Sequence, residues 1–480
     1  MKGLLISASA KSSGKTTVTM GLTAALARRR HIVQCYKKGP DYIDAMWLSH
    51  ASGRPCHNLD FFTSSHDEIV NAFAVAAAGA DLGLVEGNKG LFDGVDLEGF
   101  ESNAAMAELL GIPVLLVLDT RGMARGIAPL LTGYQQFGSN LKIAGVILNQ
   151  VGGPRHEGKL RAAVERYTDI PILGAIGRHQ SITICERHLG LMPPNEAADV
   201  SGKVDELADI IATDVDVDRI AGEVMGDVVT ESETKTGAGG AVVGIQTVLK
   251  ASSDRVAIAY ARDAAFGFYY PDDLAALSRA GAELRPFDTL RDENLPEASG
   301  LLIGGGFPEI LAPRLSANAG MRESIRQALE GGMPAYAECG GLMYLSRGLN
   351  YQGERHPMVG FVPGEAVMHK SPIGRGYVQL ADTGALPWPD LGAAGEMVPA
   401  HEFHYASLEN LPANLAYAYE VKRGHGIDGR NDGLIIGNLV AGFSHQRQTA
   451  ANRWADRFVA FVRACSQSVQ RQPEQRNFRD

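Results

Sequence analysis

Cysteine is scarce in this 480-residue sequence, and the few cysteines lie far apart. They are Cys35, Cys56, Cys185, Cys339 and Cys465. An odd number without any C-x-x-C pair argues against a disulfide framework and against a cysteine metal site. We therefore expect the protein to work in a reducing compartment.

A dense stripe of basic residues is also missing. The chain has 45 Lys and Arg against 55 Asp and Glu, which gives a formal net charge of -10. This balance argues against nucleic acid and against an anionic membrane surface as partners. It leaves room for a local basic pocket that binds an anionic substrate.

No long hydrophobic run occurs near the start of the chain. Residues 1–6 are apolar apart from Lys2, but Ser-Ala-Ser-Ala follows them at once, so the run is too short for a signal sequence or a membrane span. We expect a cytoplasmic protein. With 480 residues, 45% of them hydrophobic, the chain is long enough for two or three domains that each have a core.

A loop rich in small residues lies between a short apolar run, residues 4–8, and a helical pattern at residues 20–30. The loop, residues 9–17, reads Ser-Ala-Lys-Ser-Ser-Gly-Lys-Thr-Thr. The order strand, loop, helix is the context of a phosphate-binding loop, in which backbone N–H groups hold phosphates. Lys15 would neutralise the β and γ phosphates of ATP, and the Thr16 hydroxyl would ligate Mg²⁺. The nucleotide-binding residues predicted here are Ser12, Gly14, Lys15, Thr16 and Thr17.

Charged residues follow the next two predicted strands. Residues 32–36 end in Lys-Lys-Gly-Pro-Asp-Tyr-Ile-Asp, residues 37–44, and ligands collect at the carboxyl ends of parallel strands. A solvated loop is the alternative for this segment. Glu86 directly follows the apolar run 82–85, as a Walker B carboxylate does, and its oxygens suit Mg²⁺. We predict Lys37 and Lys38 as nucleotide-binding residues, Thr16, Asp41 and Glu86 as metal ligands, and Asp41, Tyr42 and Asp93 as substrate contacts.

Apolar runs alternate with helical stretches along the first half of the chain. Such spacing predicts an α/β fold with a parallel, doubly wound sheet. We expect a phosphate-loop domain over residues 1–200 and a helix and flexible linker over residues 201–252. A second domain should span residues 253–465, and a polar tail residues 466–480.

Cys339 lies in a glycine-flanked turn between an apolar run and a helical pattern. Glycines after the cysteine let the chain turn sharply and leave N–H groups free to face an oxyanion, and a helix start favours the thiolate form. The alternative is a buried structural cysteine. If Cys339 is a nucleophile, Gly340 supplies one oxyanion donor, and the turn at Gly305 and Gly306 supplies the other.

A cysteine nucleophile needs an imidazole close in space. His445 follows the apolar segment 434–443, so it can lie at a strand end, and we rank it first as the partner of Cys339. His401 and His404 are competitors that could pair with the thiol, bind substrate or lie on the surface. We keep His401 as a predicted substrate contact.

Taken together, these motifs resemble the cobyrinate a,c-diamide synthase family. The likeness covers about residues 2–464. The motifs that carry it are the phosphate loop and residues 37–44, 86–87, 93–94, 261–266, 305–309, 337–341 and 401–405. The resemblance implies two three-layer α/β domains, a dethiobiotin-synthetase-like ATPase domain followed by a class I glutamine amidotransferase-like domain.

The resemblance also implies a reaction. The family amidates the a and c acetate side chains of a cobalamin precursor, a tetrapyrrole, with L-glutamine and Mg·ATP. By this resemblance, Cys339 is the nucleophile that attacks glutamine, and His445 activates it. The residues that resemble the family's nucleotide, metal and substrate-activation residues are Lys15, Thr16, Asp41, Glu86 and Asp93. We also expect a homodimer.

The sequence departs from the family pattern in several places. Ser9 and Ser12 replace glycines, and Ala400 precedes His401 where glycine is usual. Gln446 and Arg447 follow His445, so the acid two residues after the histidine in typical class I amidotransferases is absent; the family generally works with a Cys and His pair.

Three other functions stay open at this point. Residues 421–429 and 452–454 are similar to the sirohaem amidase branch of the family, which amidates an acetate of sirohaem. A non-catalytic nucleotide-switch protein and a cysteine hydrolase with a regulatory ATPase are the alternatives from other classes.

Overall fold

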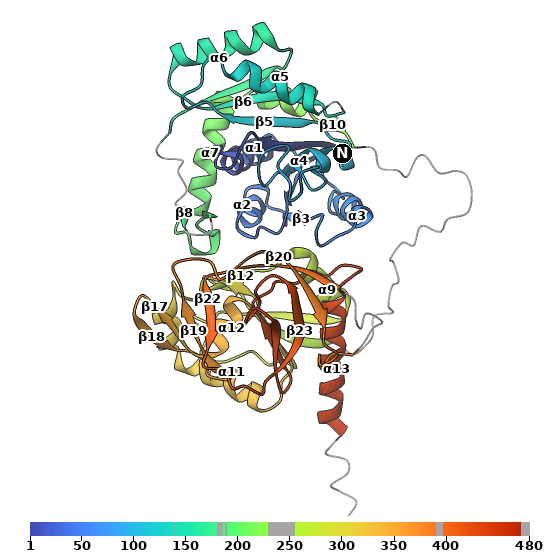
Figure 1. Ribbon diagram of the computed structural model, residues 1–480, viewed down its shortest axis with the longest axis vertical. Helices are drawn as coiled ribbons and strands as arrows, with labels where there is room; N and C mark the ends of the chain where they lie inside the picture. Colours follow the sequence, from blue (N-terminus) through green and yellow to red (C-terminus); the bar gives the residue numbers. More distant parts are fainter. Residues whose placement is uncertain (139, 180–185, 188–189, 229–254, 390–396, 472–480) are drawn as a thin grey trace, which may run out of the picture. The chain divides into compact units, whose positions relative to one another are not determined.

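The computed structural model describes residues 1–480 except 139, 180–185, 188–189, 229–254, 390–396 and 472–480 (Figure 1). The chain divides into two compact units, Met1–Gly240 and Ala241–Asp480. Each unit has its own central sheet. Among the described residues, no helix is both long enough and apolar enough to cross a membrane.

The first unit is built on a sheet in which seven strands run parallel in the order β3-β2-β4-β1-β5-β6-β7, and the short β10 adds antiparallel to β1. Its strands are β1 (Lys2–Ala8), β2 (Val33–Lys38), β3 (His57–Leu59), β4 (Leu82–Glu86), β5 (Val114–Asp119), β6 (Ile143–Val151), β7 (Ile172–Gly177) and β10 (Gly226–Asp227), with a separate hairpin of β8 (Glu186–Arg187) and β9 (Gly190–Leu191). The central strands are almost continuously apolar because helices cover both faces of a parallel sheet.

Helices connect the parallel strands of this unit. They are α1 (Lys15–Arg28), α2 (Ile43–Ser52), α3 (His66–Ala76), α4 (Asn103–Leu110), α5 (Ile127–Phe137), α6 (Pro154–Tyr167), α7 (Val200–Asp214) and α8 (Val217–Arg219), with the short turns η1 (Pro194–Glu196) and η2 (Ile220–Val224). Parallel strands need such crossovers. The carboxyl ends of β1, β2 and β4 therefore meet at one edge, where the phosphate loop and residues 37–44 and 86–93 begin.

Helix α7 is an integral part of the first unit. It packs on α1 (Figure 1), where the Arg28 guanidinium pairs with Asp205 at 2.6 Å and with Asp209 at 2.5 Å. Beyond α7, β10 pairs with β1. The first unit therefore continues past residue 200, into the segment expected to be a helix and linker. Residues 229–252 of that segment lie outside the described residues.

The second unit is built on a mixed sheet with the order β13-β11-β14-β16-β25-β24-β23-β20-β21. Its strands are β11 (Val256–Ala261), β13 (Ala282–Phe287), β14 (Gly300–Ile303), β16 (Ala335–Glu338), β20 (Gly374–Asp382), β21 (Met397–His404), β23 (Ala416–Arg423), β24 (Asn431–Ile436) and β25 (Leu439–Gly442). The strands from β13 to β25 are parallel, and those from β24 to β21 are antiparallel to their neighbours.

Helices and two smaller sheets complete the second unit. The helices are α9 (Pro271–Arg279), α10 (Ala312–Ala317), α11 (Ala319–Glu330), α12 (Gly340–Leu345) and α13 (Trp454–Arg471); the smaller sheets are β12 (Phe266–Phe268) with β15 (Gly305–Gly306), and β17 (Ser346–Tyr351), β18 (Glu354–Pro357), β19 (Val362–Met368) and β22 (Ala406–Glu409). Helix α13 passes residue 465, where we expected a tail to begin, and residues 472–480 lie outside the described part. The predicted α/β class is confirmed in both units.

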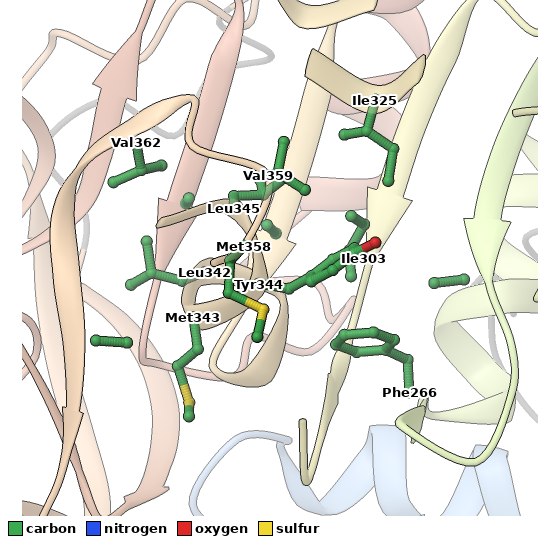
Figure 2. Close-up of a cluster of buried hydrophobic side chains, with 14 of the residues drawn as sticks. Phe266, Ile303, Ile325, Leu342, Met343, Tyr344, Leu345, Met358, Val359 and Val362 are labelled. Carbon is green, nitrogen blue, oxygen red and sulfur yellow. The ribbon is translucent and has the colours of Figure 1, made fainter. Parts of the chain in front are cut away.

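One of the hydrophobic clusters of the second unit surrounds α12. Figure 2 shows Leu342, Tyr344 and Leu345 of this helix among the side chains of Phe266 and Ile303, and all five are buried. Every residue of α12 is buried. This packing fixes the short helix that directly follows Cys339.

Candidate active sites of the two units

The phosphate loop joins β1 to α1 in a left-handed conformation. Ser12 has φ 56° and Gly14 has φ 87°. A Cβ on Gly14 would lie 2.3 Å from Asn149 Nδ2, and this amide donates to the Ser13 carbonyl at 2.9 Å. The N-cap residue of α1 is Gly14, which has no side chain to cap the helix. Its first N–H groups are therefore available to an anion, as phosphate binding at a helix N-terminus requires.

Lys15 is the first residue of α1, and its amino group turns back over the loop. Lys15 Nζ donates to the Ala10 carbonyl at 3.4 Å. Burial, together with the charge of Lys37, lowers the pKa of Lys15 to about 8. A bound phosphate would supply the negative charge that this buried ammonium lacks.

Glu86 lies at the end of β4 and is completely buried. Its Oε1 accepts from Thr16 Oγ1 at 2.6 Å and from Lys37 Nζ at 3.0 Å. Its Oε2 has no hydrogen-bond partner among the described residues. Burial raises the pKa of Glu86, although Lys37 opposes the shift. The free oxygen beside a threonine hydroxyl is what a hard divalent cation would use.

Asp44, which was not among the predicted site residues, belongs to this group. Asp44 Oδ2 accepts from Lys37 Nζ at 2.6 Å and from Thr16 Oγ1 at 3.3 Å. Burial disfavours a charged lysine, but Asp44 and Glu86 raise the pKa of Lys37. The sequence offered two aspartates in residues 37–44, and no spacing rule indicates which of them turns toward Thr16.

The remaining site residues predicted in the segment 37–44 lie beside the cluster of Thr16, Lys37, Asp44 and Glu86. Asp41 Oδ1 accepts from the backbone N–H of Asp44 at 2.8 Å, at the start of α2. Burial, and then the charge of Asp44, raises the pKa of Asp41 to about 7. Tyr42 is buried directly before α2. Lys38 is buried too, its Nζ lies 3.4 Å from Asn88 Oδ1, and burial lowers its pKa to about 8.

Asp93 holds the turn that follows Glu86. Its Oδ2 accepts from the Gly90 N–H at 3.1 Å. A Cβ on Gly90 would lie 2.7 Å from the Ser9 carbonyl, so this turn touches the phosphate loop. Asp93 therefore stands close to the predicted nucleotide site.

A magnesium ion fits these residues. Among the described residues, no three His, Cys, Asp or Glu side chains are arranged to hold a metal ion. Mg²⁺ at a nucleotide, however, usually takes one or two protein oxygens, with phosphate and water oxygens completing its shell. Thr16 Oγ1 and the unpartnered Oε2 of Glu86 meet that requirement.

In the second unit, Cys339 occupies a sharp elbow between β16 and α12. Its backbone has φ 47° and ψ -101°, a conformation with positive φ that is costly for a residue with a side chain. The Cys339 N–H donates to the Gly442 carbonyl of β25 at 2.7 Å. Neighbouring strand pairing therefore maintains the strained turn, and Cys339 as a whole is 7% exposed.

The three predicted oxyanion glycines meet at this elbow. A Cβ on Gly340 would lie 3.0 Å from the carbonyl oxygen and 3.1 Å from the nitrogen of Gly306. A Cβ on Gly305 would lie 2.6 Å from His445 Cε1. The Gly304 N–H donates to the Tyr269 hydroxyl at 2.9 Å, which fixes the turn. A side chain at residue 305 would have to displace the His445 ring, so the close approach there favours glycine.

His445 is the imidazole that reaches Cys339. Burial disfavours its charged form, but hydrogen bonds to Cys339 and Glu338 raise its pKa to about 10. Its Nδ1 lies 3.3 Å from Glu338 Oε2. Glu338 was missed from the sequence, where its only signal is that it directly precedes the cysteine.

The two competing histidines take other positions. The ring of His401 stacks on that of His445, and its Nδ1 lies 3.4 Å from the Tyr270 hydroxyl. His404 stacks on Phe443 with ring centroids 4.0 Å apart, and its Nδ1 contacts the Ala406 carbonyl at 2.7 Å. Of the three imidazoles, His445 is the one whose hydrogen bond to Cys339 contributes to its pKa.

The fold and the sites together define a two-unit enzyme class, a phosphate-loop ATP-using unit joined to a glutamine amidotransferase unit. Two family models agree with this division: the CobQ/CobB/MinD/ParA nucleotide binding domain matches residues 5–191, and the CobB/CobQ-like glutamine amidotransferase domain matches residues 257–452.

Full-length relatives specify the family more closely. Three proteins called cobyrinate a,c-diamide synthase are similar to this chain. That of Magnetococcus marinus is 44% identical over 96% of this chain and 97% of its own. That of Methanosarcina acetivorans is 38% identical over 95% of this chain and 94% of its own. That of Picrophilus torridus is 38% identical over 96% of this chain and 98% of its own. The chain belongs to the cobyrinate a,c-diamide synthase family, an expectation that these matches confirm.

Proposed function

We propose that this protein amidates the a and c acetate carboxylates of cobyrinic or hydrogenobyrinic acid, with glutamine as nitrogen donor and Mg·ATP as activator, in cobalamin biosynthesis. The observation that carries the proposal is the hydrogen-bonded pair of Cys339 and His445 in a chain that also has a phosphate loop and matches its relatives over nearly their whole length. The protein would act in the cytoplasm, and a homodimer remains part of the proposal.

Ammonia release is the chemistry of the second unit. His445 takes the proton of the Cys339 thiol, and the thiolate attacks the side-chain amide carbon of glutamine. The N–H groups of Gly340 and of the turn at Gly305 and Gly306 stabilise the oxyanion that forms. His445 returns its proton to the leaving nitrogen, ammonia departs, and a thioester remains. Water then hydrolyses the thioester to glutamate and frees the thiol.

Activation of the carboxylate is the chemistry of the first unit. An acetate oxygen of the substrate attacks the γ phosphorus of ATP, which gives an acyl phosphate and ADP. Ammonia then displaces phosphate to form the amide. Activation is needed because a carboxylate is a poor electrophile. Lys15 and the N–H groups of Ser12, Gly14, Thr16 and Thr17 would hold the phosphates.

The carboxylates beside Thr16, those of Glu86 and Asp44, would prepare this phosphoryl transfer. Thr16, Asp41 and Glu86 would hold Mg²⁺, which would supply charge neutralisation at the β and γ phosphates. Lys37 and Lys38 add positive charge at the same strand end. Asp41, Tyr42 and Asp93 would contact the tetrapyrrole in the first unit. His401 was predicted to contact substrate, and its stacking on His445 supports glutamine as the substrate that it would contact.

The rival functions lack a comparable observation. A nucleotide switch would account for the first unit alone, and it gives no role to a thiol hydrogen-bonded to a buried imidazole. A cysteine hydrolase would leave the phosphate loop with only a regulatory role. A sirohaem amidase would use the same residues, so it differs in substrate only and is an outcome of the test below.

Purified protein should be incubated with glutamine and Mg·ATP and offered cobyrinic acid, hydrogenobyrinic acid and sirohaem in parallel, with products resolved by mass. We expect two amidations of cobyrinic or hydrogenobyrinic acid. Omission of ATP is the control and should stop amidation while glutamine hydrolysis continues. Amidation of sirohaem alone would contradict the proposed substrate, and ATP hydrolysis without any amidation would contradict the reaction class.

A further inference from the structure

The glutamine site contains a buried carboxylate to which no role has been given. Glu338 is the last residue of β16 and directly precedes Cys339. Its side chain is 9% exposed. A buried carboxylate requires compensating partners, and one partner of Glu338 is His445 itself.

Glu338 divides its two oxygens between the histidine and a rigid support. Oε2 lies 3.3 Å from His445 Nδ1. Oε1 accepts from the Tyr336 hydroxyl at 2.7 Å and from the backbone N–H of Gln446 at 3.0 Å. Because Nδ1 faces Glu338, Nε2 is the ring nitrogen left for Cys339. An accepting carboxylate keeps the proton on Nδ1 and so makes Nε2 the base.

Tyr336 itself is held by packing. Its ring lies 5.2 Å from that of Trp388 and 5.0 Å from that of Trp454, centroid to centroid. Strand pairing adds to this support, because Glu338 of β16 is in register with Gly442 of β25, three residues before His445. The carboxylate is thus fixed from both strands that deliver the nucleophile and the base.

The residue two positions after His445 cannot act in this way. Arg447 is a cation; its guanidinium lies 4.3 Å from the Tyr270 ring, and it pairs with Asp272 at 3.4 Å. Its contacts are therefore to Tyr270 and Asp272, whereas Nδ1 of His445 is contacted by Glu338.

We propose that Glu338 is the positioning residue of this glutamine site, completing a Cys339, His445, Glu338 triad whose acid comes from the residue before the nucleophile. Glu338 orients His445 and stabilises its imidazolium, with Tyr336 and the Gln446 N–H as a clamp on the opposite oxygen. The inference rests on the proposed glutaminase half-reaction and is independent of which tetrapyrrole is amidated.

The alternative is a merely structural Glu338 that only satisfies the Gln446 N–H. The two roles differ in what they do to the thiol. A carboxylate that stabilises the imidazolium also favours the thiolate paired with it, whereas a structural hydrogen bond does not. The rate at which iodoacetamide alkylates Cys339, followed against pH, therefore separates the two roles.

The test compares Glu338→Gln with Glu354→Gln, a change at a glutamate whose side chain is 78% exposed. We expect Glu338→Gln to lower kcat for glutamine hydrolysis by about 10²- to 10⁴-fold with KM little changed, and to move the midpoint of alkylation to higher pH. Amidation with ammonium salts should be retained. Glu354→Gln should behave as wild type.

A second variant covers the case in which Glu338→Gln does not fold. Tyr336→Phe keeps the ring and removes one donor to Oε1, so it should move the alkylation midpoint in the same direction by a smaller amount. Unchanged midpoints in the folded variants overturn the proposal, even if activity falls. Wild-type protein that hydrolyses glutamine but amidates no tetrapyrrole would instead contradict the proposed function and leave this inference intact.

Discussion

The imidazoles of His401 and His445 stack on one another, with ring centroids 4.9 Å apart and planes inclined by 19°. Their backbones are joined as well, because each N–H donates to the other's carbonyl, at 3.2 Å and 2.7 Å. Two rings this close are not both charged without a large cost. Burial, the charge of His445 and that of Arg447 hold the pKa of His401 well below its usual range. His445 therefore carries the proton, and His401 stays neutral.

The neutral state of His401 has a consequence for stability. The unfolded chain binds a proton at this histidine near its ordinary pKa of about 6.5, and the folded chain does so only at lower pH. Stability is therefore complete above about pH 6.5 and falls as the pH drops below it, by at most about 1.4 kcal/mol per pH unit for this group. His401→Phe should remove this part of the acid sensitivity while it keeps the stacking.

Urea unfolding of wild type and His401→Phe between pH 7.5 and pH 5 measures this effect. At pH 7.5, the free energy of unfolding of the variant should be lower than that of wild type by about 1 kcal/mol because the Tyr270 contact is lost. Toward pH 5 the two curves should converge. Parallel curves over the whole range would show that His401 is not held neutral by the fold.

Replacement of the nucleophile should separate the two half-reactions. Cys339→Ala removes the thiol, and we expect glutamine-dependent amidation to fall at least about 10³-fold. Amidation with ammonium salts should stay within a few-fold of wild type, because Lys15, Thr16 and Glu86 are untouched. The measurement is product formation by mass with each nitrogen source. Loss of both activities in a folded variant would contradict separate sites for ammonia release and carboxylate activation.

Replacement of Glu86 in the first unit should have the opposite effect on the two half-reactions: amidation is lost and glutamine hydrolysis is kept. Glu86→Gln keeps the shape of the side chain but removes the charge that Lys37 and the proposed Mg²⁺ require. We expect amidation with either nitrogen source to fall by at least about 10²-fold, since removal of a transition-state charge partner costs several kcal/mol. Glutamine hydrolysis should persist. Full retention of amidation would remove Glu86 from the metal site.

Asp44→Asn is the matched comparison. It also takes a carboxylate from Lys37, but it leaves Glu86 with its contacts to Thr16 and Lys37 and with its unpartnered oxygen. If Glu86 is the metal ligand, the Asp44 variant should lose less activity and should need no more Mg²⁺ for half-maximal rate than wild type does. A raised Mg²⁺ requirement would identify Asp44 as a ligand too.

The fold followed from the sequence more readily than the contacts of the sites did. Alternation of apolar runs with helical patterns predicts parallel strands, and the carboxyl ends of parallel strands must meet, so Thr16 and Glu86 could be expected together. Helix α7 was expected as a helix, but no local pattern assigns it to the first unit rather than to the linker. Its Asp205 and Asp209 in fact pair with Arg28, a contact between residues far apart in the sequence.

The acid of the glutamine site shows the same limit. A motif search looks for a carboxylate at a fixed distance after His445 and finds Gln446 and Arg447. Glu338 reaches the histidine only because β16 and β25 are neighbours in the sheet, and that adjacency depends on the full strand order. Local patterns predict turns and strand ends, and long-range partners require the assembled fold.

The close approach of Gly305 to His445 gives a steric prediction. A methyl group at residue 305 would lie 2.6 Å from His445 Cε1, so Gly305→Ala must displace the ring or the turn. We expect glutamine hydrolysis to fall about 10²- to 10³-fold, as loss of an oxyanion donor does. Gly331→Ala is the control, because its φ is -71° and its new methyl group would meet no atom closer than 3.2 Å. Equal activities in the two variants would argue against the proposed oxyanion turn.

The lowered pKa of Lys15 gives a prediction for ATP. In the free enzyme, burial and Lys37 lower the pKa of Lys15 to about 8, so its ammonium is fully present below that pH and lost above it. Phosphate binding needs the charged form, and kcat/KM for ATP reports groups of the free enzyme. It should therefore decline above about pH 8 when amidation is run with saturating ammonium salts.

Lys38 has a pKa lowered to about the same value. Variants must therefore show which of the two lysines causes the decline in kcat/KM above about pH 8. Lys15→Arg carries a guanidinium that stays charged, and it should move the decline to higher pH, at some cost in rate because the fork of arginine differs from an ammonium. Lys38→Arg should leave the decline in place if Lys15 alone pairs with the phosphates. If the decline moves to higher pH in Lys38→Arg instead, the lysine that pairs with the phosphates is Lys38, at the end of β2, and not Lys15 of the loop.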